Sequence, residues 1–175
     1  GPRTGGAIAT AHAQRRSLSE AGPPTLRAIP LVELARTLAR EQGSIAHDAH
    51  VEVRVDADGE QLALAEPVYV RLILETLLGN ALDAVRPRGR GAVTIGIRRG
   101  ESGPEVTVAD DGPGVAPEMQ DALFRPLHTT KEAGLGLGLS IARALAQSMG
   151  GDLELDRRAP SASGGRFTLS LRGTS

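Results

Sequence analysis

The chain has 175 residues, a length that suits one domain of ordinary size with a short appendage. Its 20 Lys and Arg residues nearly balance its 21 Asp and Glu residues, which argues against nucleic-acid-binding and polybasic membrane-binding proteins. The absence of cysteine excludes disulfide frameworks, thiolate metal sites and cysteine nucleophiles. With one Tyr, two Phe and no Trp, the core must be aliphatic.

No segment has the roughly 18 apolar residues in a row that a membrane helix needs. The best candidate, from Leu135 to Met149, is interrupted by glycines and by Arg143 and Gln147. We therefore expect a cytoplasmic domain without membrane contact of its own, and membrane anchoring of the parent protein stays open. Residues 3–27 are small, polar and basic and lack periodicity, which indicates a linker, and Gly1-Pro2 resembles the remnant of a cleaved tag.

The apolar pattern predicts a mixture of helices and strands without a strict strand–helix–strand repeat. Helices show apolar residues three and four apart, with a proline at the start or a glycine at the end, and strands show a period of two. In chain order, the predicted elements are a helix over Leu31–Gln42 ended by Gly43, strands over 51–56 and Leu62–Leu64, a helix over Pro67–Val85, strands over Ala92–Arg98 and Glu105–Ala109, a helical turn within Glu118–Phe124, a helix over Leu139–Met149, and strands over Asp152–Arg157 and Arg166–Arg172. This mixture predicts a two-layer α/β sandwich with a mixed sheet.

A narrow polar stripe runs along the helix predicted over Pro67–Val85. At about 100° per residue, Thr76 and Asp83 lie within about 60° of Asn80, beside the apolar arc, whereas Glu75 points roughly 140° away. A solvated helix face would explain the stripe. Because Asn and Thr are poor helix formers, their place in mid-helix also invites a functional explanation, and Glu75 is not expected to share such a site.

The segment Asp110-Asp111-Gly112-Pro113-Gly114 directly follows a predicted strand. Asp, Pro and Gly are standard turn residues, so a plain turn is one interpretation. In the other, the two glycines let a ligand approach the backbone closely, and the Asp110 carboxylate accepts hydrogen bonds from an exocyclic amine. Adenine fits that description.

A third segment, Thr129–Leu139, contains a glycine-rich turn that leads into a predicted helix. Backbone N–H groups of such a turn form an anion site, to which Lys131 would add a positive charge for phosphate. The spacing matches neither the P-loop nor the dinucleotide-binding fingerprint, and the chain lacks the H-R-D and D-F-G motifs of eukaryotic-type protein kinases.

The three segments together resemble the ATP-binding catalytic domain of sensor histidine kinases, within the Bergerat-fold superfamily that also contains gyrase B, Hsp90 and MutL. Five motifs follow the family's order over about Ala28–Arg172: the N box is matched by LETLLGNALDA, the first glycine box by VADDGPGV, the F box by LFRPLHTTK, the second glycine box by GLGLGLSIAR and the final strand motif by GGRFTLSL. The resemblance implies a mixed, mostly antiparallel sheet covered on one face by about three helices, with an ATP lid between the glycine boxes. It divides the chain into 1–27 (tag remnant and linker), 28–172 (catalytic domain) and 173–175 (tail).

The resemblance also implies roles for individual residues. Asp110 would accept the adenine amino group, with Gly112 and Gly114 beside it, and Asn80 would hold Mg²⁺ at the ATP phosphates. The remaining ATP-site residues, which include the lid hinge and the phosphate cradle, would be Asp83, Thr129, Thr130, Lys131, Gly134, Leu135, Gly136, Leu137, Gly138 and Leu139. No residue is assigned as a catalytic base.

Two departures from the family pattern concern the N box. Thr76 stands where the N box commonly has Asn or an acidic residue, so a water-activating base is not evident, which suits a kinase better than a hydrolysing ATPase. Asp83 replaces a frequent basic residue. A second positively charged side chain for the ATP phosphates would therefore come from elsewhere, with Arg86, Arg125 and Lys131 as the candidates.

Two further departures lie near the end of the pattern. Leu127 replaces a frequent Phe in the F box. Gly165 replaces a frequent Thr in the last strand motif, which leaves Thr168 as an alternative contact beside the adenine.

The family requires a phosphoacceptor histidine on a dimerising helical hairpin. His12 is the only upstream histidine, and the residues between it and Ala28 are too few for such a hairpin. We therefore expect an excised catalytic domain that uses ATP and Mg²⁺, whose partners are the absent phosphoacceptor hairpin of the same protein and a downstream response regulator. The alternatives are a stand-alone serine kinase of the anti-sigma-factor type and a nucleotide-binding pseudokinase.

Overall fold

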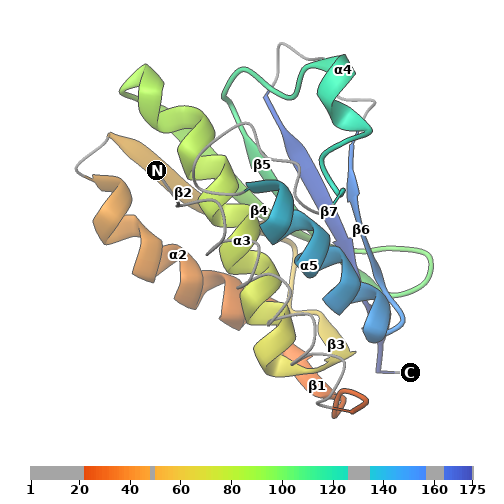
Figure 1. Ribbon diagram of the computed structural model, residues 1–175. Helices are drawn as coiled ribbons and strands as arrows, with labels where there is room; N and C mark the ends of the chain where they lie inside the picture. Colours follow the sequence, from red (N-terminus) through yellow and green to blue (C-terminus); the bar gives the residue numbers. More distant parts are fainter. Residues whose placement is uncertain (1–21, 48–49, 126–134, 157–163, 175) are drawn as a thin grey trace.

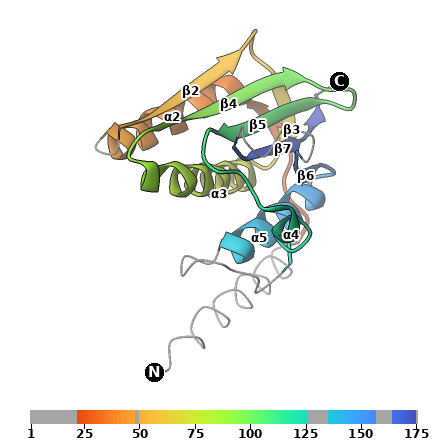
Figure 2. The ribbon, with the colours of Figure 1, turned by 90° about the horizontal axis from the view of Figure 1, so that it is seen from above.

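The computed structural model describes residues 22–47, 50–125, 135–156 and 164–174. Helices pack as one layer against one face of a five-stranded sheet (Figures 1 and 2). The helical layer consists of α2 (Leu31–His47), α3 (Pro67–Val85) and α5 (Leu135–Ser148), with the short α4 (Pro117–Gln120) and a 3-10 turn (Arg86–Arg88) near its ends. The expected two-layer sandwich with about three helices on one face is confirmed.

The five-stranded sheet is mixed and mostly antiparallel. Its order is β2-β4-β5-β7-β6, formed by β2 (Val51–Ala57), β4 (Gly91–Arg99), β5 (Pro104–Asp110), β7 (Arg166–Ser170) and β6 (Asp152–Leu155). Only the β2–β4 pair is parallel. A separate antiparallel sheet, β1-β3-β8, combines β1 (Arg27–Pro30), β3 (Leu62–Ala65) and β8 (Arg172–Gly173).

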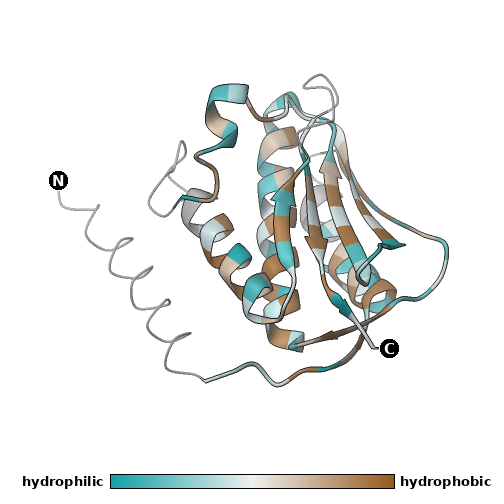
Figure 3. Ribbon diagram, turned by 90° about the vertical axis from the view of Figure 1, so that its right-hand side faces the viewer, coloured by the Kyte–Doolittle hydropathy of each residue, from teal (hydrophilic) through white to brown (hydrophobic). Residues whose placement is uncertain are grey.

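The core lies between the sheet and the helices. Hydrophobic and hydrophilic residues alternate along the strands, so one face of the sheet is apolar (Figure 3). Its inward side chains, such as Ile95 and Val106, are fully buried against apolar residues of α3 and α5, such as Leu78 and Leu139. This packing fixes which face of α3 turns toward the end of β5.

Local sequence explains where α3 begins. Pro67 occupies the first turn, where its missing N–H costs no hydrogen bond, and the Glu66 side chain accepts a hydrogen bond from the Val68 N–H at 3.3 Å. The helix then runs to Val85, as the sequence predicts.

Several predicted boundaries are wrong. Helix α2 continues past Gly43 to His47, because one glycine inside a helix costs only about 1 kcal/mol and does not end it. The last predicted strand is divided between β7 and β8, which belong to different sheets, and β6 ends at Leu155. Strand β1 was not predicted, because a four-residue strand shows too little periodicity.

Helix α5 also differs from expectation, since it begins at Leu135 and not at Leu139. The second glycine box from Leu135 onward is therefore the first part of the helix, not a turn that precedes it. Among the described residues, no helix is both long and apolar enough to cross a membrane.

Candidate functional site

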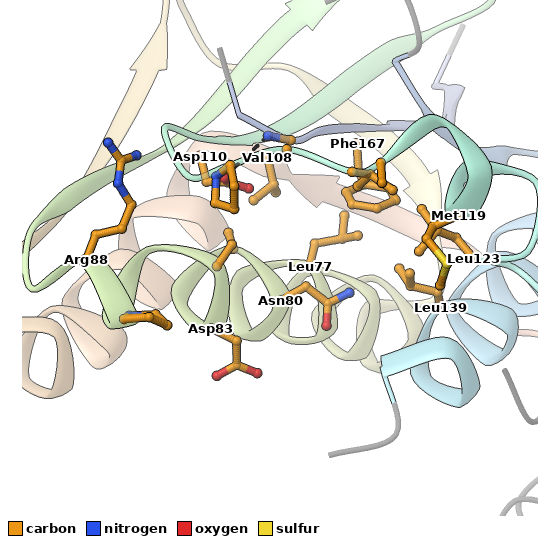
Figure 4. Close-up of a pocket in the computed structure, with 18 residues that line it drawn as sticks. Leu77, Asn80, Asp83, Arg88, Val108, Asp110, Met119, Leu123, Leu139 and Phe167 are labelled. Atoms are coloured by element: carbon orange, nitrogen blue, oxygen red, sulfur yellow. Dashed lines mark hydrogen bonds between the residues drawn. The ribbon is translucent and has the colours of Figure 1, made fainter. Parts of the chain in front are cut away.

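A cavity of about 600 Å³ opens between α3, the end of β5 and the segment that leads into α4 (Figure 4). This volume is typical of sites for small organic ligands. Its walls are mostly apolar and come from five parts of the chain: Leu77 and Ala81 of α3, Val108 of β5, Met119 and Leu123 around α4, Leu139 of α5, and Phe167 of β7. The polar side chains on its lining are Asn80, Asp83, Arg88 and Asp110.

Asp110, at the end of β5, projects into the cavity from the sheet (Figure 4). Its Oδ1 accepts hydrogen bonds from the Gly112 N–H at 2.9 Å and the Gly165 N–H at 3.3 Å. Its Oδ2 has no hydrogen-bond partner among the described residues. The carboxylate is therefore oriented by two backbone donors and offers its second oxygen to a ligand.

Burial raises the pKa of the Asp110 carboxyl above its ordinary value. The hydrogen bonds from Gly112 and Gly165 act in the opposite direction, and the charge of Asp111 adds a further, smaller increase. A ligand N–H at Oδ2 would compensate part of the cost of burying this charge.

The glycines of the first glycine box are required by close approach and by backbone conformation. A Cβ built on Gly112 would lie 2.8 Å from the Asp110 Oδ1 and 3.0 Å from the Ala84 carbonyl oxygen, so the loop packs directly on α3. Gly114, which lines the cavity, has a φ of 76°, in the left-handed region that glycine tolerates best. The interpretation of this loop as a simple surface turn does not account for its place in the wall of the cavity.

The polar stripe of α3 divides into residues with different surroundings. Asn80 and Asp83 line the cavity, but the Asp83 carboxylate also pairs with Arg86 at 3.5 Å. The Thr76 hydroxyl donates to the Leu72 carbonyl oxygen of its own helix at 2.9 Å. Asn80 is therefore the stripe residue whose amide is available to a ligand, since no hydrogen bond to a described residue occupies it.

Glu75 lies away from the cavity, as the helical wheel predicts. It pairs with Arg71 one helical turn earlier, at 2.8 Å, and Arg71 also contacts Glu41 of α2. Both side chains of the Arg71–Glu75 pair are more than a third exposed, so Glu75 takes part in a surface network between two helices.

The second glycine box brings α5 against α3. A Cβ built on Gly138 would lie 3.2 Å from the Thr76 Cγ2, so Gly138 allows the two helices to approach closely at this point. Leu139, the next residue, is buried and lines the cavity. Leu139 is the fifth residue of α5, so this helix meets the cavity just after its first turn.

Four residues of the predicted site, Thr129, Thr130, Lys131 and Gly134, lie outside the described residues. Of Leu135, Gly136 and Leu137, the structure describes the helical backbone alone. Their assignment to the ATP site stays a prediction.

Sequence reasoning missed part of the lining. Arg88 lines the cavity mouth and donates to the Asp111 carbonyl oxygen, whereas Arg86, a predicted cation candidate, pairs with Asp83. The prediction of Thr168 as a ligand contact is wrong: successive residues of a strand face opposite sides, so Phe167 lines the cavity and Thr168 does not. Period-two alternation along the last strand could have identified Phe167.

Phe124, the phenylalanine of the F box, packs against Phe167 of the cavity wall. The Phe124 ring meets Phe167 edge to face, with centroids 6.1 Å apart, and the Arg143 guanidinium lies 5.1 Å from the Phe124 centroid. Arg143 in turn forms an ion pair with Asp152 of β6 at 3.0 Å.

Acidic and histidine side chains do not cluster in the described part of the chain, where no group of three or more could hold a metal ion.

Residues 65–175 match the family described as histidine kinase-, DNA gyrase B- and HSP90-like ATPases. The chain belongs to this family. Its motif order and the position of its cavity between the helices and the sheet agree with that membership. The matched residues include every element that lines the cavity.

The curated relatives of this ATPase domain are sensor histidine kinases. The C4-dicarboxylate transport sensor protein DctB of Rhizobium meliloti is 34% identical over 90% of the chain, and the sensor protein FixL of Bradyrhizobium diazoefficiens is 33% identical over 79%. The aligned part spans only 24% of DctB and 28% of FixL.

Solved structures give the same result. The catalytic domain of histidine kinase ThkA superposes with a TM-score of 0.75 at 25% identity, covering 85% of this chain and 95% of that domain. Full-length ShkA in complex with AMPPNP superposes with a TM-score of 0.70 at 25% identity, covering 86% of this chain and 32% of ShkA. The chain is thus a histidine-kinase-type ATPase domain, the nucleotide-binding catalytic part of such proteins.

Proposed function

We propose that this domain binds Mg-ATP and donates its γ-phosphate to a histidine on a dimerising helical hairpin outside this chain. The observation that carries the proposal is the position of the Asp110 carboxylate. Its unpaired Oδ2 lies in the lining of an apolar cavity of about 600 Å³, across from the Asn80 amide on α3.

Adenine suits the inner part of this cavity. Oδ2 would accept a hydrogen bond from the 6-amino group, and Leu77, Val108 and Phe167 would enclose the flat faces of the base with apolar surface. A site built to pair with a ligand N–H discriminates strongly against ligands that lack it. Purines with an oxygen in place of the 6-amino group should bind poorly.

Asn80 suits the metal end of the site. An amide oxygen is a ligand that Mg²⁺ accepts, and Mg²⁺ is commonly held by few protein groups together with substrate phosphates. When bound, the ion would neutralise charge on the phosphate oxygens. Asn80 would provide the protein's own oxygen, which agrees with the lack of a carboxylate cluster in the described residues.

The phosphates would lie toward the N-terminal end of α5, the helix whose fifth residue, Leu139, lines the cavity. Backbone N–H groups at a helix N-terminus attract anions. We assign Thr129, Thr130, Lys131 and Gly134 to the phosphate end as well, on the family pattern. Arg88 at the cavity mouth is a further cation within the lining.

The N box supports transfer to a protein acceptor in preference to transfer to water. The two positions before Leu77 carry Thr76, whose hydroxyl donates within its own helix, and Glu75, which pairs with Arg71. Neither is free in the cavity to activate a water molecule. A kinase benefits from this, because hydrolysis would waste ATP.

Labelling a separate phosphoacceptor hairpin tests the proposal. The chain is incubated with γ-labelled ATP, Mg²⁺ and the helical hairpin of the same protein, with a hairpin carrying His→Gln at the acceptor as the control. We expect an acid-labile, base-stable label on the intact hairpin, and its passage to the cognate response regulator.

Two outcomes would contradict histidine transfer. An acid-stable label would indicate a serine kinase of the anti-sigma-factor type. ATP binding without any label on the hairpin would indicate a pseudokinase.

A further inference from the structure

The wall beside Asp110 has no side chain at position 165. Gly165 is buried and lines the cavity, and its N–H donates to the Asp110 Oδ1. A Cβ built on Gly165 would lie 3.0 Å from the Asp110 Oδ2 and 3.9 Å from its Cγ, and it would meet no other described atom within 4 Å. Within the described part of the chain, the space next to Oδ2 is therefore not filled by another side chain.

A carbon 3.0 Å from a carboxylate oxygen is closer than ordinary van der Waals contact, so a Cβ at position 165 would crowd the Asp110 Oδ2. A side chain at position 165 would occupy a place next to Oδ2 that a ligand atom can otherwise take. Asp110 itself cannot move to fill the space, because Oδ1 is held by the N–H groups of Gly112 and Gly165. The opening is thus a fixed feature of the base end of the cavity.

We propose that Gly165 determines which purines this site accepts, and that the site binds adenine nucleotides with a small alkyl substituent on the 6-amino group about as well as ATP. This proposal rests on the proposed function, in which Oδ2 accepts the 6-amino N–H. A singly substituted amine keeps one N–H for Oδ2, and its alkyl group enters the space that Gly165 leaves.

The neighbouring wall is compatible with an alkyl group. Apart from Asp110, the side chains that enclose the base end are apolar, and they include Val108 and Phe167. A methyl group there would be removed from water without displacing a polar group from its hydrogen bond. Burial of one such group favours binding by no more than about fourfold, so the expected preference is small.

Calorimetric titrations with ATP, N6-methyl-ATP and N6,N6-dimethyl-ATP test the proposal on the chain, on Gly165→Ala and on Gly165→Thr. For the unchanged chain, we expect the Kd of N6-methyl-ATP to lie within about threefold of the Kd of ATP. The dimethyl analogue has no N–H for Oδ2 and should bind at least about tenfold more weakly.

Both variants should raise the ratio of the Kd of N6-methyl-ATP to the Kd of ATP. We expect an increase of about tenfold or more in Gly165→Thr, because one additional carbon in a filled pocket changes binding by such factors. Gly79→Ala serves as the matched control, since a Cβ there meets nothing within 4 Å and Gly79 is not part of the lining. It should leave the ratio unchanged. If Gly165→Thr does not fold, Gly165→Ala provides the comparison.

The proposal is overturned if the unchanged chain prefers ATP over N6-methyl-ATP by more than about tenfold, or if the variants leave the ratio unchanged. These results are distinct from failure of the proposed function, in which neither nucleotide binds.

Discussion

Gly164 lies directly against the backbone of Asp110. Asp110 is the last residue of β5, whereas Gly164 lies two residues before the start of β7. A Cβ built on Gly164 would overlap the Asp110 carbonyl oxygen, and the φ of Gly164 is 84°. This approach lets the next residue donate its N–H to the Asp110 Oδ1 across 55 positions of sequence. The entry to the last strand of the sheet thus orients the carboxylate that faces the cavity.

Gly164→Ala should therefore destabilise the domain and weaken nucleotide binding together. The positive φ and the overlap with Asp110 both oppose a side chain, and we expect a loss of at least about 2 kcal/mol in the free energy of unfolding. Urea denaturation measures this loss. Gly79→Ala, in an open helical position, should be neutral or stabilising by up to about 1 kcal/mol. Equal effects of the two substitutions would contradict the account.

Asn80→Ala tests the metal end of the site. Without Mg²⁺ the variant should bind ATP about as well as the unchanged chain, because in the proposed site the Asn80 amide would act on the phosphates only through the ion. With Mg²⁺ it should lose most of the gain in affinity that the ion provides, by about tenfold. Titrations with and without EDTA measure both values. A variant that responds to Mg²⁺ like the unchanged chain would remove Asn80 from the metal site.

Glu75→Ala tests which side of α3 faces the nucleotide, the side of Glu75 or the side of Asn80. Because Glu75 pairs with Arg71 on the helix surface, its removal should leave the Kd for Mg-ATP within about twofold. The cost in stability should not exceed about 1 kcal/mol, as for exposed ion pairs generally. Loss of ATP binding in this variant would show that Glu75, and not Asn80, faces the nucleotide.

Asp110 also makes stability depend on pH in the nucleotide-free chain. Its folded-state pKa is raised by burial, so the native state favours the protonated carboxyl. The corresponding stability is fully present below the unfolded-state pKa and is lost as pH rises through the raised folded-state pKa. The Asp110→Asn variant does not lose stability in this way, because its side chain carries no charge at any of these pH values.

We therefore expect Asp110→Asn to be at least as stable as the unchanged chain at neutral pH, and its relative advantage to shrink as the solution is acidified. Chemical denaturation between about pH 7 and about pH 4 measures the difference. A difference that grows on acidification would have the wrong sign for a pKa raised by burial.

The sequence was sufficient for the fold class and for the residues at the centre of the site. Helical periodicity over Pro67–Val85 gave correct bounds for α3 and placed Asn80 and Glu75 on different sides. The aspartate that ends a predicted strand, two residues before a glycine, was predicted to contact a ligand, and the structure places the Asp110 carboxylate in the lining of a mostly apolar cavity.

The rest depends on contacts between distant segments, which one sequence does not reveal. Glycines usually mark turns, but Gly138 lies inside α5. A glycine suits this position because Thr76 of α3 approaches it closely. Arg88 joins the lining of the cavity and donates to the carbonyl oxygen of Asp111, 23 positions further along the chain, a contact that the sequence does not reveal.

The most direct test of the account is calorimetric titration of ATP, with and without Mg²⁺, into the unchanged chain, Asp110→Asn and Asp111→Asn. Asp111 is a matched control: its Oδ1 accepts from the Ala92 N–H at 2.9 Å, a role that an amide oxygen can also fill, and it does not line the cavity. The account predicts a Mg²⁺-sensitive Kd of roughly micromolar size for the unchanged chain and for Asp111→Asn, and a loss of at least about tenfold in Asp110→Asn. Equal affinity in all three proteins would contradict it.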